Sequence, residues 1–316
     1  MELDKFNNNE FDLAELIKVI WKKKISIIVL SIVISIFNVF YALSLANVYT
    51  SDAVLAPNDD TQSNMTVFSD IGGLASLAGI DVGSSSSASD YNVTIRSLSS
   101  RQFLKDFIEE RDLFLDIFAV SSYDLDTGKT EYDPTLYDVE KAQWVRKIQK
   151  PYLPKPSAYE VRETLLERLT IDKDNKTGFL FLTYTHANPN FAKYILDSLI
   201  VDINIYMKNR DIAFYERVSS SLLEAVRVEI DKNLIKSIYS LLESNEKKLA
   251  IAKASNEYAL KIIDQPIVPE KKSYPFRSKM VIIMSLLGGI FSTIFFVIYD
   301  HIKKIGGIRK ILEFLK

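Results

Sequence analysis

Two long apolar runs, one near each end of the chain, dominate the pattern of hydrophobic and polar positions. Residues 25–46 read ISIIVLSIVISIFNVFYALSLA, residues 280–299 read MVIIMSLLGGIFSTIFFVIY, and neither run contains Asp, Glu, Lys or Arg. A helix needs roughly 20 residues to cross a hydrocarbon core of about 30 Å, so each run predicts a transmembrane helix. A cleaved signal peptide is the alternative for the first run. That run is longer than the apolar part of such a segment, and no small-x-small cleavage site closely follows it.

The basic residues around the runs predict the orientation of the chain in a membrane. Lys22, Lys23 and Lys24 stand directly before the first run, and the next Lys or Arg after it is Arg96. Because Lys and Arg are retained on the cytoplasmic side, the N-terminus is expected to be cytoplasmic. A second span then returns the C-terminus to the cytoplasm and leaves residues 47–279 as an outer domain.

Between the runs, the hydrophobic pattern predicts a mixed α/β domain. Strands are expected where apolar and polar residues alternate, at 47–57, 169–174, 179–185 and 258–264. Helices are expected where apolar residues recur every three or four positions: two pieces within 90–113, a weaker one at 136–149 and one at 158–169. Residues 123–134 are expected to form a loop that turns at Asp126-Thr127-Gly128.

The longest helical pattern begins at Asn188-Pro189, where Asn at the cap and Pro at the first helical position form a strong start signal. Residues 190–265 contain no Gly and no Pro, and apolar residues recur at helical spacing to about residue 254. We expect one long helix or a kinked pair. The alternative is two or three helices folded back into a bundle.

A single helix of this length cannot be buried by a domain of this size, so it predicts packing against like helices of neighbouring subunits. The candidates for these oligomer contacts are apolar residues in its second half: Leu222, Val226, Ile230, Leu234 and Ile238.

The amino-acid composition excludes several kinds of functional site. The formal net charge is -2 with dispersed Lys and Arg, which gives no case for nucleic-acid binding. The chain has no Cys, and its only histidines, His186 and His301, are expected on opposite sides of the membrane. Cysteine-ligated zinc, a His-based metal cluster and a Ser-His-Asp triad with a spare His are therefore excluded. No phosphate-binding loop is present, and we expect no cofactor, no metal and no enzymatic activity. His186 is interpreted as a packing residue.

Glycines and prolines mark two further segments. Residues 69–90 are rich in Gly and Ser, which is typical of a flexible loop and also compatible with a conformable surface that contacts a subunit or a polymer. Pro266, Pro269 and Pro275 precede the second run, where prolines hold the chain extended. Gly288 and Gly289 lie within that run and are suited to close helix packing.

The order of these elements resembles a known family. The pieces are Trp21 with its three lysines, residues 53–55 (AVL), residues 73–79 (GLASLAG), residues 100–104 (SRQFL), the long helix led by Asn188-Pro189, and the proline-bearing entry to the second run. Together they resemble the Wzz-type chain-length-determinant family, the polysaccharide co-polymerases of bacterial inner membranes.

The resemblance implies an α+β membrane protein in which two transmembrane helices flank a periplasmic α/β base domain with a long extended helix. It implies a ring-shaped homo-oligomer that sets the length of O-antigen or a related polymer without catalysing bond formation. The implied partners are a membrane polysaccharide polymerase and a lipid-linked glycan. The prolines at 266, 269 and 275 become a joint between scaffold and membrane, and Gly288 and Gly289 match glycines often seen in that span.

The resulting division of the chain has five parts: a cytoplasmic N-terminus with an interfacial helix (1–24), a first span (25–46), a periplasmic domain (47–279), a second span (280–299) and a cytoplasmic basic tail (300–316). Within the periplasmic domain, the base comprises 47–187 and 257–279, and the helical arm comprises 188–256.

Two other functions fit the sequence less well. A two-span sensory or adaptor protein with an outer ligand-binding domain needs a cytoplasmic output module, and only 17 residues follow the second run. An outer glycan hydrolase needs paired carboxylates, but Glu109 and Glu110 are adjacent on a predicted helix and do not face each other.

Overall fold

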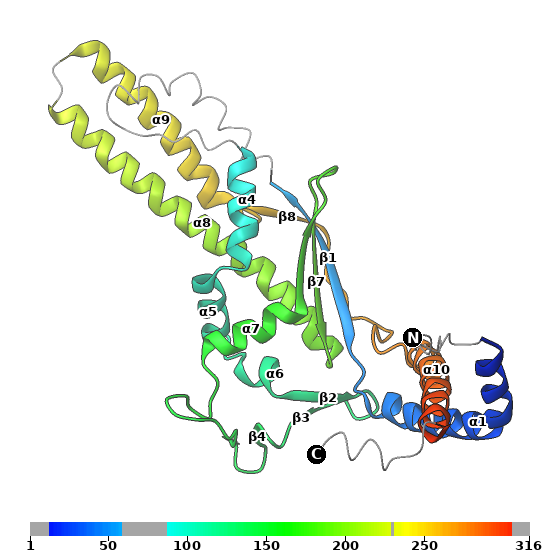
Figure 1. Cartoon of the computed structure of the whole chain (residues 1–316). Coiled ribbons are helices and arrows are strands. Elements are labelled where there is room, and N and C mark those ends of the chain that lie inside the picture. The colour runs from blue at the N-terminus through cyan, green and yellow to red at the C-terminus, as the bar shows by residue number, and fades with distance from the viewer. Residues whose placement is uncertain (1–12, 59–86, 229–230, 305–316) are drawn as a thin grey trace, which may run out of the picture. The chain divides into compact units, whose positions relative to one another are not determined.

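The computed structural model describes residues 13–58, 87–228 and 231–304 (Figure 1). It divides into two compact units, one made of Met1–Ala46 with Ser273–Lys316 and the other of Asn47–Lys272. We call them the apolar unit and the sheet unit. Most of the Gly- and Ser-rich segment, the first residues of the chain and its basic tail lie outside the described residues, and so does Ile230.

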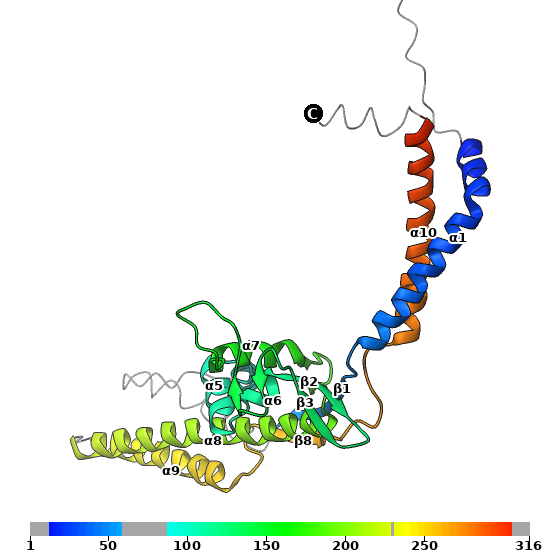
Figure 2. The ribbon, with the colours of Figure 1, turned by 90° about the horizontal axis from the view of Figure 1, so that it is seen from below.

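The apolar unit consists of two long helices, α1 (Leu13–Ser44) and α10 (Arg277–Lys304), which lie side by side (Figures 1 and 2). Their apolar stretches, Ile17–Ser44 and Arg277–Asp300, are 28 and 24 residues long and little buried. Both are long enough to cross a bilayer. The short interfacial helix expected before the first run is continuous with it, since α1 passes through Lys22, Lys23 and Lys24 without a break.

The sheet unit is built on a four-stranded antiparallel sheet with the order β6-β7-β1-β8. The strands are β1 (Tyr49–Pro57), β6 (Leu169–Lys173), β7 (Leu180–His186) and β8 (Leu260–Asp264). All four expected strands are present, at bounds within two residues of the expected ones. Burial alternates along β1 and β7, so one face of the sheet packs inward and the other is more open.

Helices cover the inward face of the sheet. They are α4 (Ser87–Leu98), α5 (Arg101–Glu110), α6 (Phe114–Phe118), α7 (Ala158–Arg168) and the first half of α8 (Pro189–Val228). Leu55, Leu182 and Tyr184 of the sheet share one core with Phe107 of α5 and Leu165 of α7. The starts of α5, α7 and α8 follow from caps: Ser100, Ser157 and Asn188 each accept hydrogen bonds from backbone N–H groups of the first turn.

Residues 120–144 differ from the expectation. The expected loop at 123–134 is a hairpin of β2 (Val120–Asp124) and β3 (Lys129–Tyr132), although its turn is where it was placed. The weak helix expected at 136–149 is wrong, because the chain there forms β4 (Tyr137–Asp138) and β5 (Gln143–Trp144). The rings of Tyr137 and Trp144 pair across these strands at 5.4 Å. Such aromatic cross-strand pairs stabilise sheets and here override a weak helical pattern.

The helical pattern after Asn188 also resolves differently from the favoured expectation. Instead of one continuous helix to residue 254, α8 ends at Val228 and α9 (Lys232–Ala254) runs back along it (Figures 1 and 2). The alternative of helices folded back on each other is therefore confirmed. The break needs no Gly or Pro because Asp231 caps α9, accepting hydrogen bonds from the backbone N–H groups of Asn233 and Leu234. We keep the name helical arm for this pair, α8 together with α9.

Candidate functional site

The two helices of the arm meet along a seam with heptad-like spacing. The buried residues are Tyr215, Ser219 and Leu222 on α8, and Ile238, Asn245, Leu249 and Ala252 on α9. Spacings of three, four and seven place each set on one helical face. Asn245 donates to the carbonyl of Tyr215 at 2.8 Å and to Ser219 Oγ at 2.7 Å, so a buried amide fixes the register of the hairpin.

The predicted oligomer contacts are therefore distributed differently from the expectation. Leu222 and Ile238 are buried within the protomer, where they stabilise the hairpin. Val226 is half-buried and Leu234 is exposed, so contact with a neighbouring subunit stays a prediction for these two residues. Ile230 lies outside the described part of the chain.

A different apolar stripe is exposed on the first half of α8. Tyr194, Val201 and Ile205 are spaced by seven and four residues, which places them on one face of the helix. Each remains between 42% and 51% exposed. The inward face of the same helix, including Leu199 and Ile203, is completely buried against the sheet. The helix is thus apolar on two faces, of which the protomer covers one.

The joint between the sheet and the arm depends on Asn204, whose side chain is buried within α8. Its Oδ1 accepts hydrogen bonds from the backbone N–H groups of Ala259 at 2.7 Å and Leu260 at 2.9 Å. Its Nδ2 donates to the carbonyls of Leu260 at 3.1 Å and Ile200 at 3.0 Å. One side chain therefore fixes the start of β8, the strand that follows the arm. Sequence reasoning missed it, although a polar residue amid Ile200, Ile203 and Met207 is a recognisable signal.

Two further polar contacts stiffen this region. The Arg111 guanidinium, just after α5, donates to both carboxylate oxygens of Asp202 at 2.6 and 2.7 Å, and the pair raises the pKa of Arg111. Tyr258 donates to Asp211 at 2.8 Å, and its pKa is raised, first by burial and then by this carboxylate. Because the pair of Arg111 and Asp202 is bidentate, it holds the end of α5 and α8 in one relative orientation.

In the apolar unit, Gly288 is placed where only a glycine fits. A Cβ added at Gly288 would lie 2.6 Å from Cγ2 of Ile34 on α1, whereas one added at Gly289 would meet Ser31 Oγ at an ordinary 3.9 Å. Close to these glycines, the hydroxyl oxygens of Ser31 and Ser292 are 2.7 Å apart. The small residues therefore allow α1 and α10 to approach closely and to hydrogen-bond across the contact.

Arg277, at the first residue of α10, holds the other end of this helix pair. Its guanidinium donates to the carbonyls of Ala42 and Leu45 at 3.0 Å each. The last carbonyls of a helix have no partner within it, so Arg277 satisfies groups at the end of α1. The sequence pattern alone did not single out Arg277.

The remaining predicted residues are placed as follows. Lys22 and Lys24 are exposed on α1, with the Lys24 ammonium 4.9 Å from the Trp21 ring. Pro266 is buried, Pro269 is half-buried in the sheet unit, and Pro275 belongs to the apolar unit. The boundary between the two units thus falls within the stretch that the three prolines span. Their role as a joint stays a prediction.

Comparison with known proteins assigns the two ends of the chain. A family model described as "Chain length determinant protein" (Wzz) matches residues 9–111, and one described as "G-rich domain on putative tyrosine kinase" (GNVR) matches residues 221–300. Residues 9–111 thus match the Wzz-type chain-length-determinant family.

The two matched segments meet in the fold. The first contains α1 and β1, the second contains β8 and α10, and both α1 with α10 and β1 with β8 are packed or paired neighbours. Neither match includes residues 112–220. A search of the curated proteins gave no match.

Among solved structures, one described as a full-length bacterial polysaccharide co-polymerase is 13% identical, with a TM-score of 0.41, over 93% of this chain and 99% of that one. A fragment of the polysaccharide co-polymerase WzzB from Salmonella Typhimurium is 12% identical, with a TM-score of 0.32, over 72% of this chain and 100% of that fragment.

The described residues contain no group of three or more His, Cys, Asp or Glu side chains able to hold a metal ion. His186 is buried, its Nε2 lies 2.9 Å from the carbonyl oxygen of Asp116, and its Nδ1 accepts from the backbone of Asn188. Burial lowers the pKa of His186 to about 4, so the ring is neutral near neutral pH. It is a packing residue at the end of β7.

Proposed function

We propose that this protein is a non-catalytic, oligomeric regulator of chain length in the polymerisation of bacterial O-antigen or a related surface polysaccharide. The match of the chain-length-determinant model to residues 9–111 carries the proposal. The two terminal apolar helices support an inner-membrane location. The three lysines before the first apolar stretch favour cytoplasmic termini and a periplasmic sheet unit.

The proposed mechanism is scaffolding. Copies of the protein would assemble into a ring and present repeated, weak binding surfaces to a membrane polymerase and to the growing lipid-linked glycan. Several weak contacts on one assembly raise the effective affinity without any single strong site, so chain length would depend on the geometry of the assembly.

The stripe of Tyr194, Val201 and Ile205 supports the oligomer. Apolar side chains on the uncovered face of a rigid helix gain free energy when a neighbour removes them from water, at roughly 25 cal/mol per Å². The inner face of α8 is fixed against the sheet, so the stripe is presented by a stable surface.

Polymer length in cells provides the test. A strain that lacks the gene should still make the polysaccharide, but without a preferred length, and the wild-type gene should restore a narrow band on a gel. The variant Ile205→Asp should broaden the band and reduce the oligomer seen by native mass spectrometry of the detergent-solubilised chain. Leu125→Asp, which introduces the same charge at an exposed site 60% accessible in the β2–β3 turn, serves as control.

Two results would count against the proposal. If loss of the gene leaves the length distribution unchanged, the protein does not regulate length. If loss abolishes polymer synthesis altogether, a catalytic or transport role replaces the regulatory one. A normal oligomer in Ile205→Asp would remove only the stripe from the interface.

A further inference from the structure

The segment between β4 and α7 combines positive charge with exposed apolar side chains. Residues 139–155, which we call the basic loop, read VEKAQWVRKIQKPYLPK and contain five basic residues and one acidic residue. Its exposed apolar residues are Val139, Val145, Ile148, Tyr152 and Leu153, of which Leu153 is 71% exposed. Neither family model matches this segment, so the basic and apolar composition of the loop is not part of the matched family sequence.

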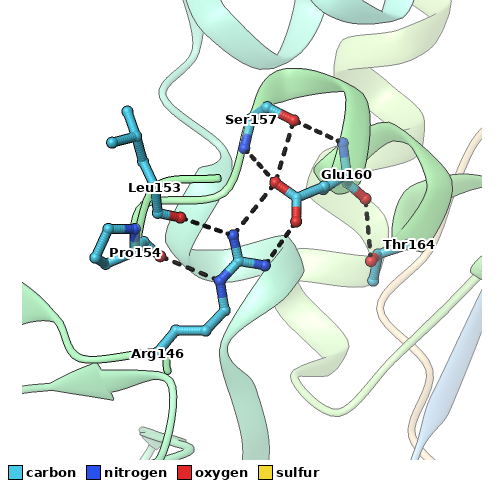
Figure 3. Close-up of polar contacts among 6 residues, drawn as sticks. All are labelled: Arg146, Leu153, Pro154, Ser157, Glu160 and Thr164. Atoms are coloured by element: carbon cyan, nitrogen blue, oxygen red, sulfur yellow. Dashed lines mark hydrogen bonds and ion pairs between the residues drawn. The ribbon is translucent and has the colours of Figure 1, made fainter. Parts of the chain in front are cut away.

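The basic loop is held in a defined shape by Arg146 (Figure 3). The guanidinium donates to the carbonyls of Leu153 at 3.1 Å and Pro154 at 3.2 Å, and to both carboxylate oxygens of Glu160 on α7 at 2.7 and 3.2 Å. Glu160 also completes the capping box of α7 with Ser157. Its pKa is lowered, chiefly by Arg146, so the ion pair persists at neutral pH.

This clamp determines which side chains reach solvent. The carbonyl of Leu153 points toward Arg146, whereas its side chain points away from the network (Figure 3). Trp144 is held from the other side by the rings of Tyr137 at 5.4 Å and Phe118 at 6.2 Å. Exposed Leu153 and Tyr152 are therefore presented by a braced loop and lose little conformational freedom on binding.

The basic loop belongs to the end of the sheet unit that is covalently tied to the apolar helices. At that end, Lys272 Nζ lies 3.4 Å from Asn47 Oδ1, and Tyr49 pairs with His186. His186 contacts α6 through the carbonyl of Asp116, and α6 contributes Phe118 beneath Trp144. In Figure 1, β4 lies next to β3 and far from α9.

We propose that the basic loop docks on the surface of the membrane that holds the two apolar helices, and that it binds anionic lipid headgroups. The inference rests on the membrane location in the proposed function. Lys147 and Lys150 are exposed and would lie over anionic phosphates, while Tyr152 and Leu153 insert at the boundary of headgroups and acyl chains. Basic residues beside aromatic and aliphatic ones are the composition that favours such an interface.

A second copy of the chain is the competing occupant. A protein partner would have to cover the lysines as well as Leu153 and supply acidic groups to pair with them. A bilayer satisfies both requirements at once, and this end of the sheet unit is the one that the chain joins directly to the apolar helices. The observations therefore favour lipid.

The full chain contains no Cys, so a single labelled position can report the environment of the loop. We would label Leu153→Cys with an environment-sensitive fluorophore and place the full-length protein in nanodiscs of phosphatidylethanolamine with a minority of phosphatidylglycerol. A lipid carrying a headgroup-level spin label should quench this probe. The same label at Tyr239→Cys, 53% exposed on α9, is the matched control and should remain unquenched.

Charge removal separates lipid docking from a protein contact. Near an anionic surface each basic residue contributes about fivefold in binding, so Lys147→Gln with Lys150→Gln should shift the docking equilibrium roughly 25-fold toward the undocked state. Pure phosphatidylcholine should weaken the docking in the same way. Quenching that persists unchanged in both cases would overturn the role of charge.

The proposal is wrong if the probe at position 153 is as exposed in nanodiscs as the control probe. It is also wrong if the probe is shielded from solvent as strongly in detergent without lipid as in nanodiscs, and if this shielding increases with protein concentration. In that case a second copy of the chain, and not lipid, covers the basic loop. The length distribution of the polymer in cells is a separate measurement from quenching. If the probe is not quenched, the proposed regulation of chain length still stands. If loss of the gene leaves polymer length unchanged, the quenching result still stands.

Discussion

Replacing Asn204 by leucine should loosen the start of β8 far more than it disturbs the rest of the sheet unit. Leucine keeps the approximate side-chain volume but loses the acceptor for the Ala259 and Leu260 N–H groups and the donor for the Leu260 carbonyl. Each buried backbone group left without a partner costs about 1–3 kcal/mol. Ala259 is only half-buried and can recover water, which lowers the expected total to about 2–5 kcal/mol.

Hydrogen exchange at individual amides is the suitable assay, because a chain with two units does not have a single well-defined unfolding equilibrium. At about 1.4 kcal/mol per factor of ten, the Ala259 and Leu260 amides should exchange roughly 30-fold to several thousand-fold faster in Asn204→Leu. Amides of β1 that pair with β7 should change much less. Asn233→Leu, at an exposed asparagine near the start of α9, is the matched control.

A second substitution tests the role of each Asn204 atom. Asn204→Asp retains an acceptor for the two N–H groups but sets an oxygen against the carbonyls of Ile200 and Leu260. Protonation of the introduced carboxyl supplies a donor again, so exchange at Leu260 should slow as the pH falls. If Asn204→Leu exchanges like the wild type at both amides, Asn204 does not hold β8 and the reasoning fails.

Three further changes test the helix pair and the buried histidine. Gly288→Ala should weaken the packing of α10 against α1 by about 1–3 kcal/mol, because the added Cβ would lie 2.6 Å from Ile34 Cγ2. Amides of α10 in the detergent-solubilised chain should then exchange faster, and adding Ile34→Ala should restore their protection; unchanged exchange in Gly288→Ala would contradict the close contact. Arg277→Gln should reduce disulfide cross-linking between cysteines placed at the end of α1 and the start of α10; undiminished cross-linking would show that other contacts hold these ends. His186 has a folded-state pKa of about 4 against 6.5 unfolded, so the stability that it contributes to the sheet unit is complete above pH 6.5 and should decline as the pH falls toward 4, by about 3 kcal/mol at most. The protection of β7 amides against hydrogen exchange should fall over the same pH range, and His186→Gln should abolish this dependence.

The parts of the fold that follow from local signals could be predicted from sequence. The alternation in β1 and β7 and the caps at Ser100 and Asn188 depend on neighbours in the chain, and the apolar helices depend on length and composition alone. The β4–β5 pair could not be predicted in this way, since the partner of Trp144 is chosen by packing against Phe118. The reversal before α9 is not marked by Gly or Pro, because the capping residue Asp231 is sufficient to start the new helix.

The candidate site was predictable only in part. Gly288 was identified as a packing residue, and the structure supplies its partner, Ile34. Leu222 and Ile238 were predicted as contacts with neighbouring subunits, whereas the structure buries both within the protomer. Periodicity does not reveal whether the helix that packs against them belongs to the same chain or to another. Asn204 and Arg277 act on backbone groups distant in sequence, which no local pattern encodes.

The pairing of β1 with β8 has a consequence for how the protein is made. β1 is an inner strand whose partner on one side comes from the last part of the sheet unit, more than 200 residues later in the chain. Until β8 is synthesised, that edge of β1 offers unpaired backbone groups to other chains. Contacts of such large sequence separation also form slowly. Newly made copies should therefore pass through an aggregation-prone interval that ends only when β8 is available to pair with β1, so protection of the chain during synthesis should matter for this protein.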